Sequence, residues 1–319
     1  MAASTERTMS AFVDRMQWIA RVAAGRTNAG RGLTVFPDDV YLVSYPRSGN
    51  TWARFLIANL VDTDNPPSFA DIEARIPAIN LWSDRTLRRV PRPRILKSHE
   101  YFDPRYKRVI YIVRDPRDVA VSSYHYAIKR RDLADGYPVE RFVPRFIAGE
   151  FFSDFANWGD HVRSWLGTRQ REKGFLLLRY EEMLASLEPE LTKIASFLNV
   201  DTSPDRLSRC AELSSVERLR ELERKQSRDW KLTKKTRQDK PFVRAAAAGG
   251  WRQVLSPQSV ALIESAWGPI MGELRYELTV AAANSLAATD RKLAESLPLQ
   301  EAVVATAGSR IAAPEKQGG

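Results

Sequence analysis

The sequence contains a single cysteine, Cys210, in 319 residues, so no disulfide bond can form within one chain. It contains no run of about eighteen apolar residues, the length that a membrane-spanning helix needs. The first residues, MAASTERTMS, lack the apolar core of a signal peptide. These absences favour a reducing compartment, and we expect a cytoplasmic protein without a transmembrane segment.

Several common motifs of metal sites are missing as well. The sequence has no HExxH, no CxxC and no close carboxylate cluster with the spacing of metal ligands, so we expect no bound metal. Histidine is scarce, with three residues: His99, His125 and His161. A catalytic imidazole therefore has few candidates.

Length and composition are those of a folded protein with one main domain. The chain has 319 residues, of which 44% are hydrophobic, enough for one large core. Between residues 36 and 278, apolar runs alternate with helical patterns, which predicts an α/β fold with a central, mainly parallel sheet flanked by helices on both sides. We expect a helical extension at 1–35 and a disordered, alanine-rich tail at 279–319.

The most informative segment is VYLVSYPRSGNTWARFLIANL, residues 40–60. It begins with four apolar residues that do not alternate with polar ones, as in a strand buried on both faces of a parallel sheet. Gly49 is free to adopt a positive φ, and Asn50 is the expected N-cap of the amphipathic helix that follows. The segment therefore predicts a strand, a tight loop and a helix.

The N-terminus of such a helix directs free N–H groups and a partial positive charge at the loop, which is predicted to bind an anion. Arg47, Ser48 and Thr51 add further donors. A Walker-type P-loop requires GxxxxGK[ST], whereas this loop has one glycine and no lysine before Thr51. This difference disfavours an ordinary P-loop kinase, although a nucleotide kinase stays open as an alternative.

A second strand and helix follow in RVIYIVRDPRDVAVSSYHY, residues 108–126. Arg114 ends the apolar run, Asp115 can cap the next helix, and Pro116 can occupy its first turn. Ser122 lies on that helix. An arginine at the carboxyl end of a strand and a hydroxyl on the following helix can bind a second anion, because ligands of open α/β sheets bind at this edge.

Between these segments, RILKSHEYF is predicted to form a short strand that brings Lys97 and His99 to the same edge. The two residues are two positions apart and point the same way on an extended chain. A neutral imidazole, with a reference pKa of about 6.5, can accept the proton of an attacking hydroxyl near neutral pH. His99 is therefore the candidate general base, and a structural histidine is the alternative.

The string YPRSGNTW closely resembles the YPKSGTTW loop of the sulfotransferases that use 3′-phosphoadenosine 5′-phosphosulfate (PAPS). The K-x-H motif and the Arg and Ser of the second segment follow in the order and approximate spacing of that family. The resemblance covers about residues 36–278. It implies a P-loop-like nucleotide-binding fold and the transfer of a sulfuryl group from PAPS to a hydroxyl or amine acceptor, without a metal ion.

The resemblance also implies roles for single residues. His99 would be the general base, while Lys97 and Arg47 would stabilise charge on the sulfuryl group. Arg114 and Ser122 would bind the 3′-phosphate that distinguishes PAPS from other nucleotides. The loop that would hold the 5′-phosphosulfate comprises Arg47, Ser48, Gly49, Asn50, Thr51 and Trp52.

The C-terminal third carries weaker similarities. Tyr180, after the strand-like GFLLLR, corresponds to the tyrosine of the family that contacts the adenine, and Ser214 to a threonine that touches the nucleotide. The aromatic-rich residues 137–155 are predicted to line the acceptor pocket. Trp158 and Trp165, seven residues apart, are predicted core residues.

The string FVRAAAAGGW, residues 242–251, resembles the FxRKGxxGDW loop of the family. The resemblance implies nucleotide contacts from Phe242, Val243 and Arg244. Alanines at 245–246 replace the Lys and Gly of the family, and a glycine replaces the Asp before the tryptophan. The loop therefore has one positive charge fewer than the family's loop, and how strongly it would bind the 3′-phosphate is left open.

The net charge is +10, and the basic residues do not form one tract but are densest in two patches, residues 85–94 and 224–237. They could attract the anionic cofactor or an acidic acceptor, or they could be solvated loops. Apart from Trp230, neither has the interleaved aromatic residues of a single-strand binding groove, so we expect no nucleic-acid partner. A non-catalytic nucleotide- or nucleic-acid-binding protein is a second alternative. The acceptor is expected to be a small molecule or a carbohydrate with a hydroxyl group, and a homodimer is left open.

Overall fold

The computed structural model describes residues 28–244 and 246–279. The helix predicted within 1–35 lies outside the described residues. All but the first residue of the predicted tail, 279–319, also lies outside them. The division of the chain into an extension, a main domain and a tail therefore stays a prediction.

Four parallel strands form the central sheet in the order β2-β1-β3-β4. Their bounds are Val40–Ser44 (β1), Ile95–Ser98 (β2), Arg108–Val113 (β3) and Phe175–Arg179 (β4). All five residues of β1 are buried, because helices cover both faces of the sheet. Tyr41 packs into the core on one face and Leu42 into the core on the other, as the two-residue period of a strand requires.

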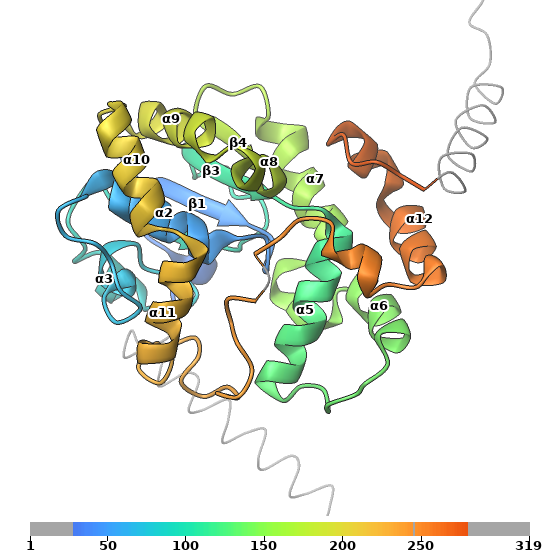
Figure 1. Ribbon diagram of the computed structural model, residues 1–319. Coiled ribbons are helices and arrows are strands. Elements are labelled where there is room, and N and C mark those ends of the chain that lie inside the picture. The colour runs from blue at the N-terminus through green and yellow to red at the C-terminus, as the bar shows by residue number, and fades with distance from the viewer. Residues whose placement is uncertain (1–27, 245, 280–319) are drawn as a thin grey trace, which may run out of the picture.

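Two layers of helices enclose the sheet, which confirms the predicted fold class (Figure 1). One face is covered by α2 (Asn50–Val61), α3 (Ile72–Arg75), α8 (Tyr180–Ala185), α9 (Leu187–Leu198), α10 (Pro204–Leu213) and α11 (Val216–Gln226). The other face is covered by α5 (Pro116–Arg130), α6 (Val139–Ile147), α7 (Trp158–Arg169) and α12 (Pro257–Glu273). The short elements are η1 (Gly30–Gly32), α4 (Asp84–Leu87), η2 (Glu150–Phe155) and η3 (Gly250–Gln253).

The helix starts follow from local chemistry. Asp115 caps α5, its side chain accepting a hydrogen bond from the N–H of Arg117, and Pro116 occupies the first turn, as predicted. On α7, Trp158 and Trp165 are completely buried, which confirms their assignment to the core. These contacts fix the helices that surround the carboxyl edge of the sheet.

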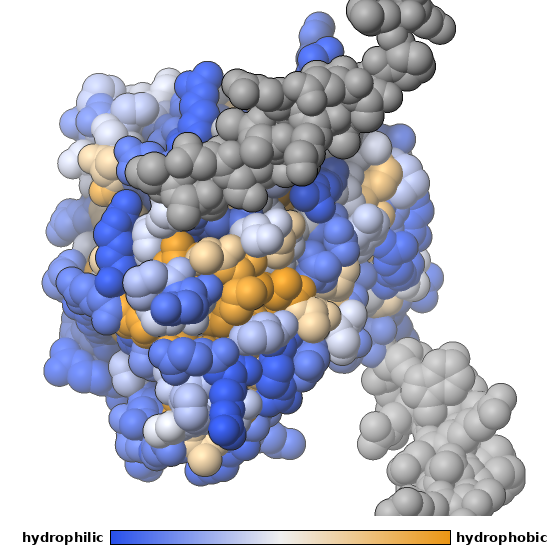
Figure 2. Space-filling model, turned by 90° about the vertical axis from the view of Figure 1, so that its right-hand side faces the viewer, coloured by the Kyte–Doolittle hydropathy of each residue, from blue (hydrophilic) through white to orange (hydrophobic). Residues whose placement is uncertain are grey.

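Figure 2 shows the side of the molecule on which α6 and α12 lie in Figure 1, and apolar side chains gather near the middle of this face. On α12, Leu262 is 47% exposed. Within residues 28–244 and 246–279, every helix is too short or too polar to cross a membrane.

The carboxyl ends of the strands meet at one edge, because all four strands run in the same direction. The loop at 45–49 follows β1, His99 follows β2, Arg114 follows β3, and Tyr180 follows β4. The fold therefore brings residues from four distant parts of the sequence to one place.

Candidate active site

The loop after β1 has a backbone shape that few residues adopt. Gly49 has a φ of +96°, and a Cβ atom at this position would lie 2.4 Å from the ring of Tyr180. Glycine is therefore required both by the backbone and by the space available. Arg47 also has a positive φ, of 68°, which is uncommon for a residue other than glycine. This loop is held in a specific shape by its surroundings.

Helix α2 begins at Asn50, and Gly49 is its N-cap residue. The prediction that Asn50 is the N-cap is wrong, because its side chain turns to β1 and donates hydrogen bonds to Ser44 Oγ (3.2 Å) and to the carbonyl of Leu42 (3.4 Å). Among the described residues, no side chain caps α2. Its first N–H groups are thus left for a ligand, as an anion site requires.

The side chain of Arg47 contacts α5 and two aromatic rings. Its Nε–H donates to Ser122 Oγ at 3.1 Å, which joins the β1 loop to α5. Its guanidinium carbon lies 4.5 Å from the ring centre of Tyr126 and 4.6 Å from that of Phe242. These contacts fix the plane of the guanidinium group.

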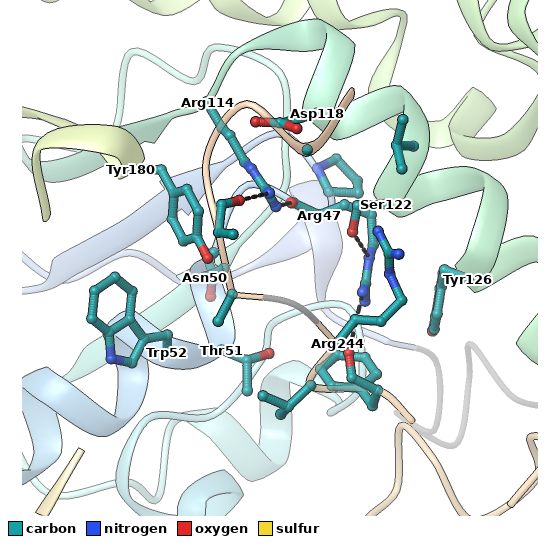
Figure 3. Close-up of a pocket in the computed structure, with 18 of the residues that line it drawn as sticks. Arg47, Asn50, Thr51, Trp52, Arg114, Asp118, Ser122, Tyr126, Tyr180 and Arg244 are labelled. Carbon is teal, nitrogen blue, oxygen red and sulfur yellow. Dashed lines mark hydrogen bonds between the residues drawn. The ribbon is translucent and has the colours of Figure 1, made fainter. Parts of the chain in front are cut away.

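Arg114 and Arg244 enter the same space (Figure 3). Arg114 lies over the ring of Tyr180 at 4.3 Å and donates to the carbonyls of Arg47 (3.2 Å) and Ala247 (3.0 Å). Its buried Nε atom has no hydrogen-bond partner in the described structure. A buried donor without a partner in the protein is a candidate contact for a ligand.

None of the guanidinium groups of Arg47, Arg114 and Arg244 has a carboxylate within ion-pair distance in the described part of the chain. Burial lowers the pKa of Arg47 to about 10, and the positive charges of Arg114 and Arg244 add to this effect. Burial and the charge of Arg114 also lower the pKa of Arg244. Three cations that repel one another in a partly buried cavity favour the binding of a multiply charged anion.

These residues line one cavity of about 430 Å³, a typical size for a small-molecule site. Most of the predicted site residues lie on its wall: Arg47, Gly49, Asn50, Thr51, Trp52, Lys97, His99, Arg114, Ser122, Tyr180, Phe242, Val243 and Arg244. Ser48 and Ser214 do not line it. The hydroxyl of Ser214 accepts from Asn59 (2.9 Å) and its carbonyl accepts from the indole of Trp52 (3.0 Å), so Ser214 supports the wall from behind.

His99 has a defined tautomer. Its Nδ1 lies 2.7 Å from the carbonyl oxygen of Ser44, which can only accept, so Nδ1 carries the proton and Nε2 carries the lone pair. Burial, and then the charge of Lys97, lower the pKa of His99 well below 6.5. The imidazole is thus neutral at neutral pH, with Nε2 as the basic atom.

Lys97 lies beside this base, and both side chains line the cavity, as the extended spacing predicted. The ammonium is 3.4 Å from Oδ1 of Asn80. Burial, and then the positive charge of Arg54, lower the pKa of Lys97 to about 7, while the carboxylate of Glu73 acts in the opposite direction. An anion bound next to Lys97 would favour its charged form.

Several cavity residues were not identified as single candidates from the sequence. Asn80, Asp118 and Tyr126 line the wall: Asp118 and Tyr126 lie within the segment 108–126 but had no predicted role in the site, and Asn80 belongs to no recognised motif. Phe152 and Phe155 also line it, and both come from the aromatic-rich segment that was predicted to do so. The abundance of aromatic residues was the only sequence signal for this wall.

A parallel sheet, a loop that precedes the uncapped N-terminus of α2 at its carboxyl edge, and a neutral imidazole beside a cationic cavity are features typical of a nucleotide-binding transferase. Residues 37–275 match the family model described as the sulfotransferase domain, and the chain therefore belongs to the sulfotransferase family. The predicted family is thereby confirmed. The comparisons support a PAPS-dependent sulfotransferase and do not favour the kinase or the non-catalytic alternatives.

Curated relatives and solved structures agree with this assignment. Mouse sulfotransferase 1B1 is 28% identical over 232 residues, covering 68% of this chain and 77% of the relative. The 3-beta-hydroxysteroid sulfotransferase of Cavia porcellus is 28% identical over 197 residues, covering 58% and 67%. A crystal structure of retinol dehydratase with androsterone and the inactive cofactor PAP has a TM-score of 0.67 at 20% identity, covering 79% of this chain and 85% of that one.

Proposed function

We propose that this protein transfers the sulfuryl group of PAPS to a hydroxyl group of a small, largely apolar acceptor, with His99 as the general base. The observation that carries the proposal is the fixed tautomer of His99. Its Nδ1–H is held by the carbonyl of Ser44 at 2.7 Å, so the free lone pair of Nε2 is available on a residue that lines the cationic cavity.

The cavity has the features that a nucleotide with two separate anionic groups requires. The N-terminus of α2, Ser122 and the guanidinium groups of Arg47, Arg114 and Arg244 supply donors and positive charge. Trp52 and Tyr180, with ring centres 5.8 Å apart, provide aromatic surface for a base. PAPS supplies the sulfuryl group, and the product is 3′-phosphoadenosine 5′-phosphate (PAP).

In the proposed reaction, Nε2 of His99 takes the proton of the acceptor hydroxyl while the hydroxyl oxygen attacks sulfur. Lys97 and Arg47 stabilise the negative charge that develops as the bond from sulfur to the 5′-phosphate oxygen breaks. Positioning and charge stabilisation suffice for such an in-line displacement, so no metal ion is part of the proposal.

The aromatic residues of the cavity near His99 favour a small apolar alcohol or phenol as the acceptor. The ring centres of Phe155 and His99 lie 5.6 Å apart, and the ring of Phe152 packs against that of Tyr45. Among the residues that line this part of the cavity, Asn80 contributes an uncharged amide. A relative carries the name 3-beta-hydroxysteroid sulfotransferase, which is consistent with an apolar acceptor. A cytoplasmic location is part of this proposal, and a homodimer is left open.

The test is a calorimetric titration with PAP and, in parallel, with AMP, ATP and ATP plus magnesium. We expect PAP to bind more tightly than AMP, ATP or ATP plus magnesium. In a separate activity assay with PAPS, we expect turnover of apolar alcohols and phenols. The variant His99→Ala should lose a factor of about 10² to 10⁴ in kcat while its affinity for PAP stays within about twofold. A preference for ATP with magnesium, or full activity of His99→Ala, would contradict the proposal.

A further inference from the structure

We propose that two buried carboxylates, those of Glu223 and Asp118, are positioning residues that hold the nucleotide loop in its binding shape before the nucleotide arrives. The nucleotide loop is defined here as residues 242–244 and 246–251. The inference rests on the proposed function, because it assumes that this loop contacts PAPS.

Glu223 holds the beginning of the nucleotide loop. It lies on α11 and is 8% exposed. Its Oε1 accepts a hydrogen bond from the N–H of Phe242 at 2.5 Å, and its Oε2 accepts from the N–H of Val243 at 2.8 Å. One carboxylate thus binds two successive backbone amides, which fixes both the position and the direction of the chain.

Asp118 holds the end of the same loop in a similar way. It lies on α5, on the other side of the sheet from α11, and is 3% exposed. Its Oδ2 accepts from the N–H of Gly249 at 2.7 Å, and its Oδ1 accepts from the N–H of Trp251 at 3.0 Å. The two carboxylates therefore hold the loop from two separate helices.

Three cavity-lining residues of the loop, Arg244, Ala246 and Ala247, lie between these anchors. Arg220 donates to the carbonyl of Arg244 at 2.5 Å, and Arg114 donates to that of Ala247 at 3.0 Å. The side chain of Arg244 lines the cavity. Because the backbone around Arg244 is already bonded to the protein, the position of that backbone does not depend on contacts with the nucleotide.

Such preorganisation has a direct effect on affinity. An arginine on an unattached loop loses conformational freedom when it binds a phosphate, and this loss weakens binding. This chain has alanine where the family resembled has a lysine in the loop, so it has one positive charge fewer. We infer that the two carboxylate anchors offset part of that loss by ordering the loop in advance.

The experiment compares Glu223→Gln with Glu221→Gln. Both residues lie on α11, but Glu221 is paired with the exposed side chains of Arg218 and Lys225. Hydrogen exchange of the nucleotide-free protein should become at least tenfold faster at Phe242 and Val243 in Glu223→Gln and stay unchanged in the control. The Kd for PAP should rise about tenfold, while kcat at saturating PAPS stays within about twofold.

Asp118→Asn provides a second, independent test. Asp118 lines the cavity, so removal of its negative charge should by itself strengthen the binding of an anion. We expect the opposite, a weaker affinity for PAP with faster exchange at Gly249 and Trp251, because the anchor is lost. Weaker binding in this variant therefore cannot come from a simple charge effect.

The outcomes separate the two proposals. Faster exchange without a change in the Kd for PAP, or a loss of kcat alone, would overturn the positioning role of these carboxylates. A wild-type protein that fails to bind PAP would instead overturn the proposed function, whatever the exchange rates of the loop are.

Discussion

The pH dependence of the reaction should have an alkaline limb that belongs to Lys97, and one substitution should move it. The side chain of Lys97 is 4% exposed, and burial is the main cause that lowers its pKa to about 7. Above that pH the amine is neutral in the free enzyme and cannot stabilise the developing charge. We therefore expect kcat/KM for PAPS to fall as the pH rises above about 7.

The variant Asn80→Asp places a carboxylate where an amide oxygen now lies 3.4 Å from the ammonium. At an effective dielectric constant of about 20, this distance corresponds to an attraction of about 5 kcal/mol. Part of that energy is lost because the new carboxylate must itself leave water. A net gain of about 1.4 to 3 kcal/mol would raise the pKa of Lys97, and with it the alkaline limb, by about one to two pH units.

The assay is kcat/KM for PAPS between about pH 6.5 and 9.5, with an aliphatic alcohol as acceptor so that the acceptor does not ionise. Asn80→Leu is the matched control, because it removes the amide without adding a charge. His99 should add no acidic limb in this range, since its pKa lies well below 6.5 and its basic form persists. An alkaline limb that stays in place in Asn80→Asp, or that moves equally in Asn80→Leu, would refute the assignment to Lys97.

Three further substitutions test other parts of the structure. Gly49→Ala should weaken PAP binding at least tenfold in calorimetry, because φ is +96° and the new Cβ would lie 2.4 Å from an aromatic ring. Glu73→Gln should lower the free energy of unfolding in urea by about 3 to 5 kcal/mol, because it leaves Arg54, its ion-pair partner at 2.9 Å, buried without a counter-charge. Tyr111→Phe should lower kcat more than it changes the Kd for PAP, because its hydroxyl lies 2.9 Å from His161 Nδ1, and His161 Nε2 is bonded to the carbonyl of His99.

The strands and the helix that follows β3 could be predicted because their signals are local. A continuous apolar run indicated β1, an apolar β-branched run indicated β3, and Asp115 followed by Pro116 indicated the start of α5. The expected N-cap at Asn50 was wrong for a reason that local sequence cannot supply. The side-chain amide of Asn50 donates to an acceptor on β1. Gly49 is the N-cap residue, because the backbone there has a positive φ that favours glycine.

Within the site too, residues with a local sequence signal could be predicted, and residues placed by contacts between distant segments could not. Residues at the carboxyl ends of strands or directly after them, such as Lys97, His99 and Arg114, could be placed at one edge, because parallel strands bring their carboxyl ends together. The position of Asn80 could not be predicted, because its segment is placed beside β2 by a single bridge between Ala78 and Lys97. Such a bridge depends on backbone geometry and leaves no pattern of side chains in the sequence.

The role of Glu223 is even harder to predict from the sequence than that of Asn80, because its partners are backbone amides 19 and 20 residues away. Any residue except proline could supply those amides, so the sequence of the nucleotide loop carries no sign of its anchor. The arginines of the site are the opposite case. Their charges are partly buried and repel one another, which lowers the stability of the fold. Such a cost is expected where the binding of a ligand, and not stability, determines the residue. Motifs thus reveal the groups that face the ligand, whereas the groups that hold them in place emerge only from the fold.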